Sequence, residues 1–298
     1  MNAWQRWVRA PQTLLLRRLL FQLHLWLGVG CSLYVLVISL SGSALLLRSP
    51  FYQWFEPKYV APAPDAVALT GEELQARMRE VYTGYTVGFT IEGFERNLAT
   101  YVVLNQNGDY TPHYFDQYTG RDIGRANPWP IQTVQWLSDL HADLTFGRLG
   151  RKINGYGGLL FVVMSLSGLV LWWQGRARWR EGFYPQRHSP RSWWWQLHTL
   201  FGFWGLLLML AWGVSGFQLG LPQYLDTLLR WLSPESRGPA PGSALLRFFR
   251  EVHFARPGSS TWARWAWIVA SLLPTLLLLS GVVLWYKRVV RGRWWRRA

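Results

Sequence analysis

Long apolar stretches without formal charge alternate with polar segments along this chain. The stretches cover residues 19–47, 153–173, 193–222 and 265–286. Each is long enough to cross the hydrocarbon layer of a bilayer, which takes about 20 helical residues. The pattern therefore predicts a mainly α membrane protein with four transmembrane helices.

The segment 48–152, between the first two stretches, has the pattern of a small α+β domain. Residues 70–73 resemble a capping box, and residues 74–82 after them have helical periodicity. Strand-like runs follow at 85–91, 100–104 and 110–115. Asn107-Gly108 is a typical turn between the last two runs. We expect a small α+β insertion in the outer part of the protein.

The first and third stretches begin almost as copies of each other. Gln22-Leu23-His24 starts one, and Gln196-Leu197-His198 starts the other. In both, a glycine follows the histidine by four positions, and a Ser-Gly pair begins seventeen positions after it. The matching positions are Gly28 and Gly202, then Ser41-Gly42 and Ser215-Gly216. The match predicts two histidines at one depth of two membrane helices.

The second and fourth stretches are related in the same way. Predicted helices at 131–144 and 245–254 carry His141 and His253, and Ser-Gly pairs follow these histidines by 26 and 27 positions. Those pairs are Ser167-Gly168 and Ser280-Gly281. The chain thus contains two similar units. Each consists of a predicted span, an outer segment that carries a histidine, and a second predicted span. They form a parallel repeat about an axis along the membrane normal, which predicts that His24 faces His198 and that His141 faces His253.

The basic residues give the expected orientation. Of the 31 Lys and Arg residues, 15 lie in three segments that contain Glu181 as their one acid. These segments are 1–18, 174–192 and 287–298. Because short basic segments stay in the cytoplasm, we expect these three inside and the segments 48–152 and 223–264 outside. The net charge of +15 then favours anionic lipids as partners and weakens a nucleic-acid function.

Paired histidines on membrane helices suit a haem iron, which takes one axial ligand on each face of its ring. His24 and His198 would hold one haem near the cytoplasm. His141 and His253 would hold a second near the outer face, so that electrons can cross the bilayer. A straight helix from His24 to Gly42 would rise about 27 Å, close to the hydrocarbon thickness. For any single histidine, the alternative is a hydrogen bond at the interface or surface without a cofactor.

Glycines and arginines near these histidines are further candidates for the site. Gly28 and Gly202 would let a ring approach the helices closely, with plain helix packing as the alternative. Arg148 and Arg250, in the outer segments, are candidates for binding haem carboxylates or an anionic substrate. For both arginines, the alternative is contact with lipid headgroups.

Three other residues limit the interpretation. His113 and His188 have no counterpart in the repeat, and we interpret both as structural. Cys31 is the single cysteine, which excludes an internal disulfide and covalent haem attachment through CxxCH. We expect the first apolar stretch to be an uncleaved signal anchor, because it is too long for the apolar core of a signal peptide.

Together these residues resemble the PepSY-associated transmembrane helix family, which includes iron-regulated inner-membrane proteins and siderophore-iron reductases. Two segments add to the four histidines and their Ser-Gly pairs. They are Tyr114-Phe115-Asp116-Gln117-Tyr118-Thr119-Gly120, similar to the end of a PepSY unit, and His141-Ala142-Asp143-Leu144-Thr145-Phe146-Gly147.

The resemblance implies a four-helix bundle of two parallel two-helix repeats in a bacterial inner membrane, with a PepSY-like periplasmic insertion. It implies two b-type haems on His24, His141, His198 and His253, with no catalytic residue beyond the haems. Electrons would pass from the cytoplasm to a ferric siderophore or another ferric chelate in the periplasm. The electron donor would be a quinol or another protein, because no Gly-rich dinucleotide fingerprint is evident.

Two alternative functions remain open at this point. The chain could be a cofactor-free PepSY membrane protein that binds or restrains a periplasmic partner, with the histidines as packing residues. It could also keep the haems and carry electrons to another periplasmic enzyme.

Overall fold

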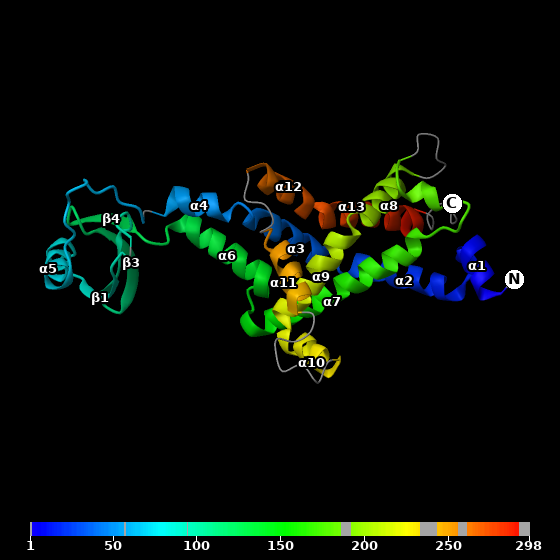
Figure 1. Ribbon diagram of the computed structural model, residues 1–298, viewed down its shortest axis with the longest axis horizontal. Helices are drawn as coiled ribbons and strands as arrows, with labels where there is room; N and C mark the ends of the chain where they lie inside the picture. Colours follow the sequence, from blue (N-terminus) through cyan, green and yellow to red (C-terminus); the bar gives the residue numbers. More distant parts are fainter. Residues whose placement is uncertain are drawn as a thin grey trace. The chain divides into compact units, whose positions relative to one another are not determined.

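The computed structural model divides the chain into two units, Leu47–Trp136 and a larger one made of Met1–Leu46 with Leu137–Ala298. The structure describes residues 2–56, 58–93, 95–185, 192–232, 243–255 and 261–291. Each unit is described by itself. The protein is mainly helical and contains one small antiparallel sheet in its described part (Figure 1).

The sheet of the smaller unit has four antiparallel strands in chain order. They are β1 Thr86–Ile91, β2 Thr100–Gln106, β3 Asp109–Asp116 and β4 Arg121–Arg125. Helix α5, Gly71–Val81, lies against one face of the sheet (Figure 1). Leu74 and Met78 of the helix pack there with Val102, Leu104 and Phe115 of the strands, and all five are buried. Helix α4, Arg48–Phe55, precedes this α+β domain.

Most of the elements expected in this domain are confirmed, and two details differ. The helix, three strands and the Asn107-Gly108 turn are present, while β4 was not predicted. The expected capping box is wrong, because the Thr70 side chain makes no hydrogen bond to the first turn of α5. Gly71, the first residue of α5, has a φ of +51°, in the left-handed region, where a capping box expects a helical residue.

The larger unit is built from helices. They are α1 Ala3–Arg9, α2 Leu15–Gly30, α3 Ser32–Leu45, the end of α6 Trp129–Asp143, α7 Gly147–Trp172, α8 Trp193–Trp204, α9 Leu206–Gly220, α10 Pro222–Leu232, α11 Ser243–His253, α12 Thr261–Ser271 and α13 Leu273–Trp285. A π-helical turn, Tyr286–Arg291, continues α13. The helices expected at 131–144 and 245–254 are present as α6 and α11.

Two described helices are long and apolar enough to cross a membrane, Gly147–Trp172 and Trp262–Arg291. The pairs α2 with α3 and α8 with α9 pass the same test together, although each pair is bent, by 62° and 64°. The described part of the chain therefore has two candidate spans, or up to four if each bent pair is one span. It is a membrane protein.

The two bends occupy the same place in the sequence repeat. One lies at Cys31 and the other at Gly205, each seven residues after the histidine of its stretch. The expectation of a straight helix from His24 to Gly42 is therefore wrong, and the rise along it is less than 27 Å. Glycine weakens the local helix at each bend, since Gly30 precedes Cys31 and Gly205 is itself the break.

Helices α7 and α9 cross at very short range through glycines. A side chain at Gly158 would meet the carbonyl carbon of Gly216 at 2.8 Å, and one at Gly155 would meet the backbone of Gly220 at 3.1 Å. Small residues of this kind let membrane helices approach each other closely. Helix α13 packs on α8, α3 and α2, and α2 packs on α7. This packing brings helices from both sequence repeats into contact.

Candidate histidine site

The four repeated histidines form two pairs in space. The ring centroids of His24, from α2, and His198, from α8, are 6.3 Å apart. Those of His141, from α6, and His253, from α11, are 6.1 Å apart. The pairs are the ones that the sequence repeat predicts. Each pair supplies two imidazoles from elements that are distant in the sequence.

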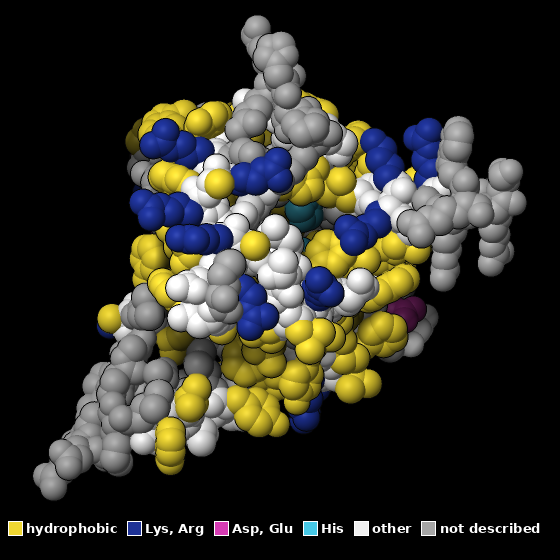
Figure 2. Space-filling model, turned by 90° about the vertical axis from the view of Figure 1, so that its right-hand side faces the viewer, with side chains coloured by type: hydrophobic (Ala, Val, Ile, Leu, Met, Phe, Trp, Pro, Cys, Tyr) yellow, Lys and Arg dark blue, Asp and Glu magenta, His cyan; other side chains and the backbone are white. Residues whose placement is uncertain are grey.

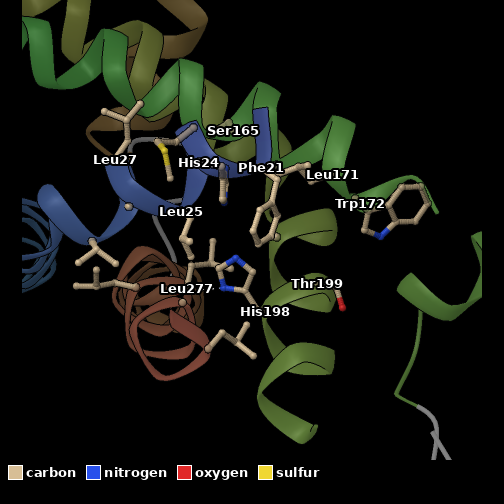
Figure 3. A pocket seen from close by; sticks show the side chains of 18 of the residues that line it. Phe21, His24, Leu25, Leu27, Ser165, Leu171, Trp172, His198, Thr199 and Leu277 are labelled. Carbon is tan, nitrogen blue, oxygen red and sulfur yellow. Dashed lines mark hydrogen bonds between the residues drawn. The ribbon is translucent and has the colours of Figure 1, made fainter. Parts of the chain in front are cut away.

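The first pair, called the inner pair below, lines a cavity of about 1010 Å³. In Figure 2, Lys and Arg side chains surround a hollow in which a histidine is visible. Within the cavity, His24 and His198 point toward each other across a mainly apolar space (Figure 3). Phe21, Leu25 and Leu277 are among its apolar walls. The volume is at the upper end for small-molecule and cofactor sites, about 300–1,000 Å³.

Each histidine in the two pairs has its Nδ1 atom next to the serine of one Ser-Gly pair. The four Nδ1–Oγ distances are 2.9 Å for His24 with Ser167, 3.0 Å for His198 with Ser280, 3.2 Å for His141 with Ser41 and 2.8 Å for His253 with Ser215. In each repeat, the serine of the first apolar stretch contacts His141 or His253, and the serine of the second stretch contacts His24 or His198. The four contacts therefore obey the sequence repeat.

Backbone carbonyls decide which nitrogen carries the proton in two of the four imidazoles. Nδ1 of His141 lies near the carbonyl of Ile38, and Nδ1 of His198 lies near that of Leu277. A carbonyl can only accept, so in these two rings Nδ1 carries the proton and the lone pair is on Nε2, the arrangement that a second hydrogen bond imposes on metal-binding histidines. All four serine hydroxyls also lie within reach of a backbone carbonyl of their own helix, and a serine that donates to it accepts from Nδ1–H.

Glycines of the Ser-Gly pairs leave room for the rings. A side chain at Gly42 would lie 2.7 Å from Cε1 of His141, and one at Gly168 or Gly281 would lie 3.3 Å from Cε1 of His24 or His198. The fourth glycine, Gly216, faces Gly158 instead. The predicted glycines Gly28 and Gly202 line the inner cavity, where added side chains would meet Met164 and Leu277.

The second pair, called the outer pair below, lies in elements outside the candidate spans. Burial lowers the pKa of His253 to about 4, and the neighbouring His141 contributes to the shift. Burial also lowers the pKa of His141. Both imidazoles are therefore neutral at ordinary pH, which is the form that binds metals.

A hydrogen-bond chain fastens the outer pair to the spans. Tyr34 Oη donates to Oδ1 of Asn154 at 2.6 Å, and Nδ2 of Asn154 donates to the carbonyl of His141 at 2.7 Å. Tyr34 also lines the inner cavity. After His141 the chain reverses through left-handed Leu144 and Thr145 before α7 begins. The chain of contacts joins α3, α6 and α7 at the outer site.

The remaining candidates lie elsewhere. Arg148, in the first turn of α7, and Arg250, in the last turn of α11, are both exposed. In the smaller unit, Nδ1 of His113 lies 3.1 Å from Asp122, which also accepts from Tyr82. This network agrees with a structural role for His113. His188 lies outside the described residues.

A comparison with protein families shows which family the chain belongs to. The family described as PepSY-associated TM region matches residues 21–244. The chain belongs to this family. The match includes His24, His141 and His198, while His253 lies beyond it. A comparison with curated proteins found no match.

The four serines were missed as functional residues in the sequence, although they were visible there as repeat markers. The informative signal was their number, one Ser-Gly pair for each of four histidines. Cations at the cavity mouth were also missed, because they were counted only as cytoplasmic charge. They are Arg17, Arg18, Lys287 and Arg288.

We predict that Ser167→Ala destabilises the protein and that Ser165→Ala does not. Both serines lie on α7, but only Ser167 accepts from a histidine, whereas the hydroxyl of Ser165 donates to the carbonyl of Phe161. Removing the Ser167 hydroxyl from Nδ1 of His24 should cost about 0.5–1.5 kcal/mol, the net contribution of a typical hydrogen bond. Denaturant titration of the purified protein in detergent measures the difference. Equal stability of the two variants would contradict the assigned hydrogen bond.

Proposed function

We propose that this protein is a membrane haem oxidoreductase that reduces a ferric chelate, such as a ferric siderophore, on the periplasmic side of a bacterial inner membrane. The observation that carries the proposal is the geometry of the two histidine pairs. A first-row metal binds imidazole nitrogen at about 2 Å, so two rings on opposite sides of one iron have centroids roughly 6 Å apart. Both pairs have this spacing.

The chemistry around the inner pair fits a haem. Its two imidazoles have Nε2 available, and the cavity between them is apolar and large enough for a macrocycle. Glycines Gly168 and Gly281 allow the rings to lie directly against the neighbouring helices. The outer pair has the same donor set, and its histidines are neutral because they are buried.

Bound haem would supply one-electron transfer at each pair. The chain would hold the two haems and orient the histidines that bind them. His24 and His198 would hold the inner haem, and His141 and His253 the outer one. The serines keep Nδ1 protonated and so keep Nε2 facing its ligand. Apolar side chains such as Leu25 and Leu277 exclude water from the inner site.

The arrangement of the chain supports transfer across the membrane. We propose four spans in two parallel repeats, with the basic segments in the cytoplasm and the α+β domain in the periplasm. Ser41, which contacts the outer pair, lies seventeen residues after His24 of the inner pair. The two pairs therefore lie at different depths of one helix hairpin, and two haems would form a path from the inner to the outer face.

The substrate follows from the family resemblance and from the outer cations. A haem held by His141 and His253 would supply one electron to a ferric chelate, whose Fe(III) would become Fe(II), which the chelator holds more weakly and would release. The electron would come from a quinol or from a reduced cytoplasmic protein. Arg148 and Arg250 are exposed in the outer segments, where they can attract an anionic chelate.

The pairing predicts which variants lose which haem. His24→Ala and His198→Ala should each remove the same haem, and His141→Ala and His253→Ala should each remove the other. Reduced-minus-oxidised spectra and the pyridine haemochrome of each purified variant measure this. His113→Ala is the matched control and should keep both haems. If His24→Ala and His141→Ala removed the same haem, the pairing would be refuted.

The substrate prediction is tested by reoxidation. Dithionite-reduced protein mixed with a ferric siderophore in a stopped-flow instrument should reoxidise, and a ferrous-specific chelator should trap one Fe(II) per electron. The gallium(III) form of the same siderophore has the same shape and charge but accepts no electron, so it should leave the haems reduced. If no ferric chelate reoxidises the protein, the acceptor is another protein and ferric reduction is excluded.

A further inference from the structure

The mouth of the inner cavity carries an unusual concentration of positive charge. Four cations line the cavity, and no Asp or Glu is among the described residues that line it. They are Arg17, Arg18, Lys287 and Arg288. Arg17 and Arg18 lie on α2, and Lys287 and Arg288 lie on the π-helical turn after α13. An apolar cavity whose lining includes cations suits an amphipathic, anionic ligand.

Arg17 is held in place without neutralisation of its charge. One Nη of Arg17 donates to the carbonyls of Leu171 and Trp173, at 2.8 and 3.2 Å. These carbonyls form the end of α7, where the helix dipole favours a cation but supplies no full negative charge. The Nε atom of Arg17 is buried and has no hydrogen-bond partner among the described residues. Arg17 therefore lines the cavity with a positive charge that no acid among the described residues neutralises.

Arg288 is held at the same cavity by an aromatic ring. Its guanidinium carbon lies 4.4 Å from the ring centroid of Phe21, and both residues line the cavity. A cation over an aromatic face is attracted by the ring and keeps its outer N–H groups free. In the described part of the chain, Arg288 forms no ion pair with an acid.

We infer that Arg17 and Arg288 bind the two carboxylates of the haem at the inner histidine pair. This inference rests on the proposed function. Haem b carries both carboxylates on one edge of its ring, opposite an apolar edge. Arg forks match carboxylates in charge and geometry, so the carboxylate edge lies at the basic mouth and the apolar edge lies deeper in the cavity. The two arginines thereby set the rotation of the ring about the axis between His24 and His198.

The test compares two iron porphyrins that differ only in these carboxylates. Apoprotein of the full chain is titrated with haemin and with haemin dimethyl ester, in which both carboxylates are masked. The phase that is lost in a His24→Ala/His198→Ala variant identifies the inner site. We expect the unmodified chain to bind haemin at this site about tenfold or more tightly than the diester, because each charged hydrogen bond contributes about 1.5–3 kcal/mol.

Three variants make the test specific. Arg17→Gln/Arg288→Gln should abolish the preference, so that haemin and its diester bind about equally. Arg17→Lys/Arg288→Lys should keep part of the preference and so show that the site still folds. Arg9→Gln/Arg291→Gln is the matched control, since it removes two exposed charges that do not line the cavity. It should keep the full preference.

The outcomes separate this inference from the proposed function. If the unmodified chain binds both porphyrins equally at the inner site, or if Arg17→Gln/Arg288→Gln keeps the preference, the haem proposal stands and the inference is overturned. If the unmodified chain binds neither porphyrin at the histidines, the proposed function and this inference both fail.

Discussion

The hydrogen bond from Nδ1 of a buried histidine to a helix serine is the interaction on which the site depends. An imidazole N–H group needs an acceptor inside the protein, and the serine oxygen supplies one when its own proton goes to a carbonyl of its helix. The contact joins two helices and orients the ring. The same interaction occurs four times, at Ser41, Ser167, Ser215 and Ser280.

The sequence repeat converts this local interaction into two sites. In each half, the first apolar stretch provides a histidine of the inner pair and a serine for a histidine of the outer pair, and the second stretch provides a serine for the inner pair. The first stretch of each half therefore contacts both pairs. The bends at Cys31 and Gly205, of 62° and 64°, lie at matching positions of the two halves. The close glycine crossing of α7 and α9 places the halves in contact.

Features carried by local pattern could be predicted from the sequence, whereas features that depend on helix crossings could not. The apolar stretches, most of the α+β domain and the two histidine pairs follow from periodicity and spacing. Strand β4 was missed because Arg121–Arg125 contains one apolar side chain, Ile123, and no alternation. The His24–Ser167 bond joins residues 143 positions apart, and Arg17 and Arg288 meet at one cavity from opposite ends of the chain. Only tertiary packing brings such residues together.

The central claim is that the four histidines act as two pairs of axial ligands. Low-temperature electron paramagnetic resonance of the oxidised, purified protein tests it most directly, because two imidazole ligands make ferric haem low-spin. The account predicts low-spin ferric signals that integrate to about two haems per chain. Replacing His24 or His198 should remove one signal, and replacing His141 or His253 should remove the other. A colourless protein from cells with sufficient haem, or a dominant high-spin signal from an iron with one open position, would contradict it.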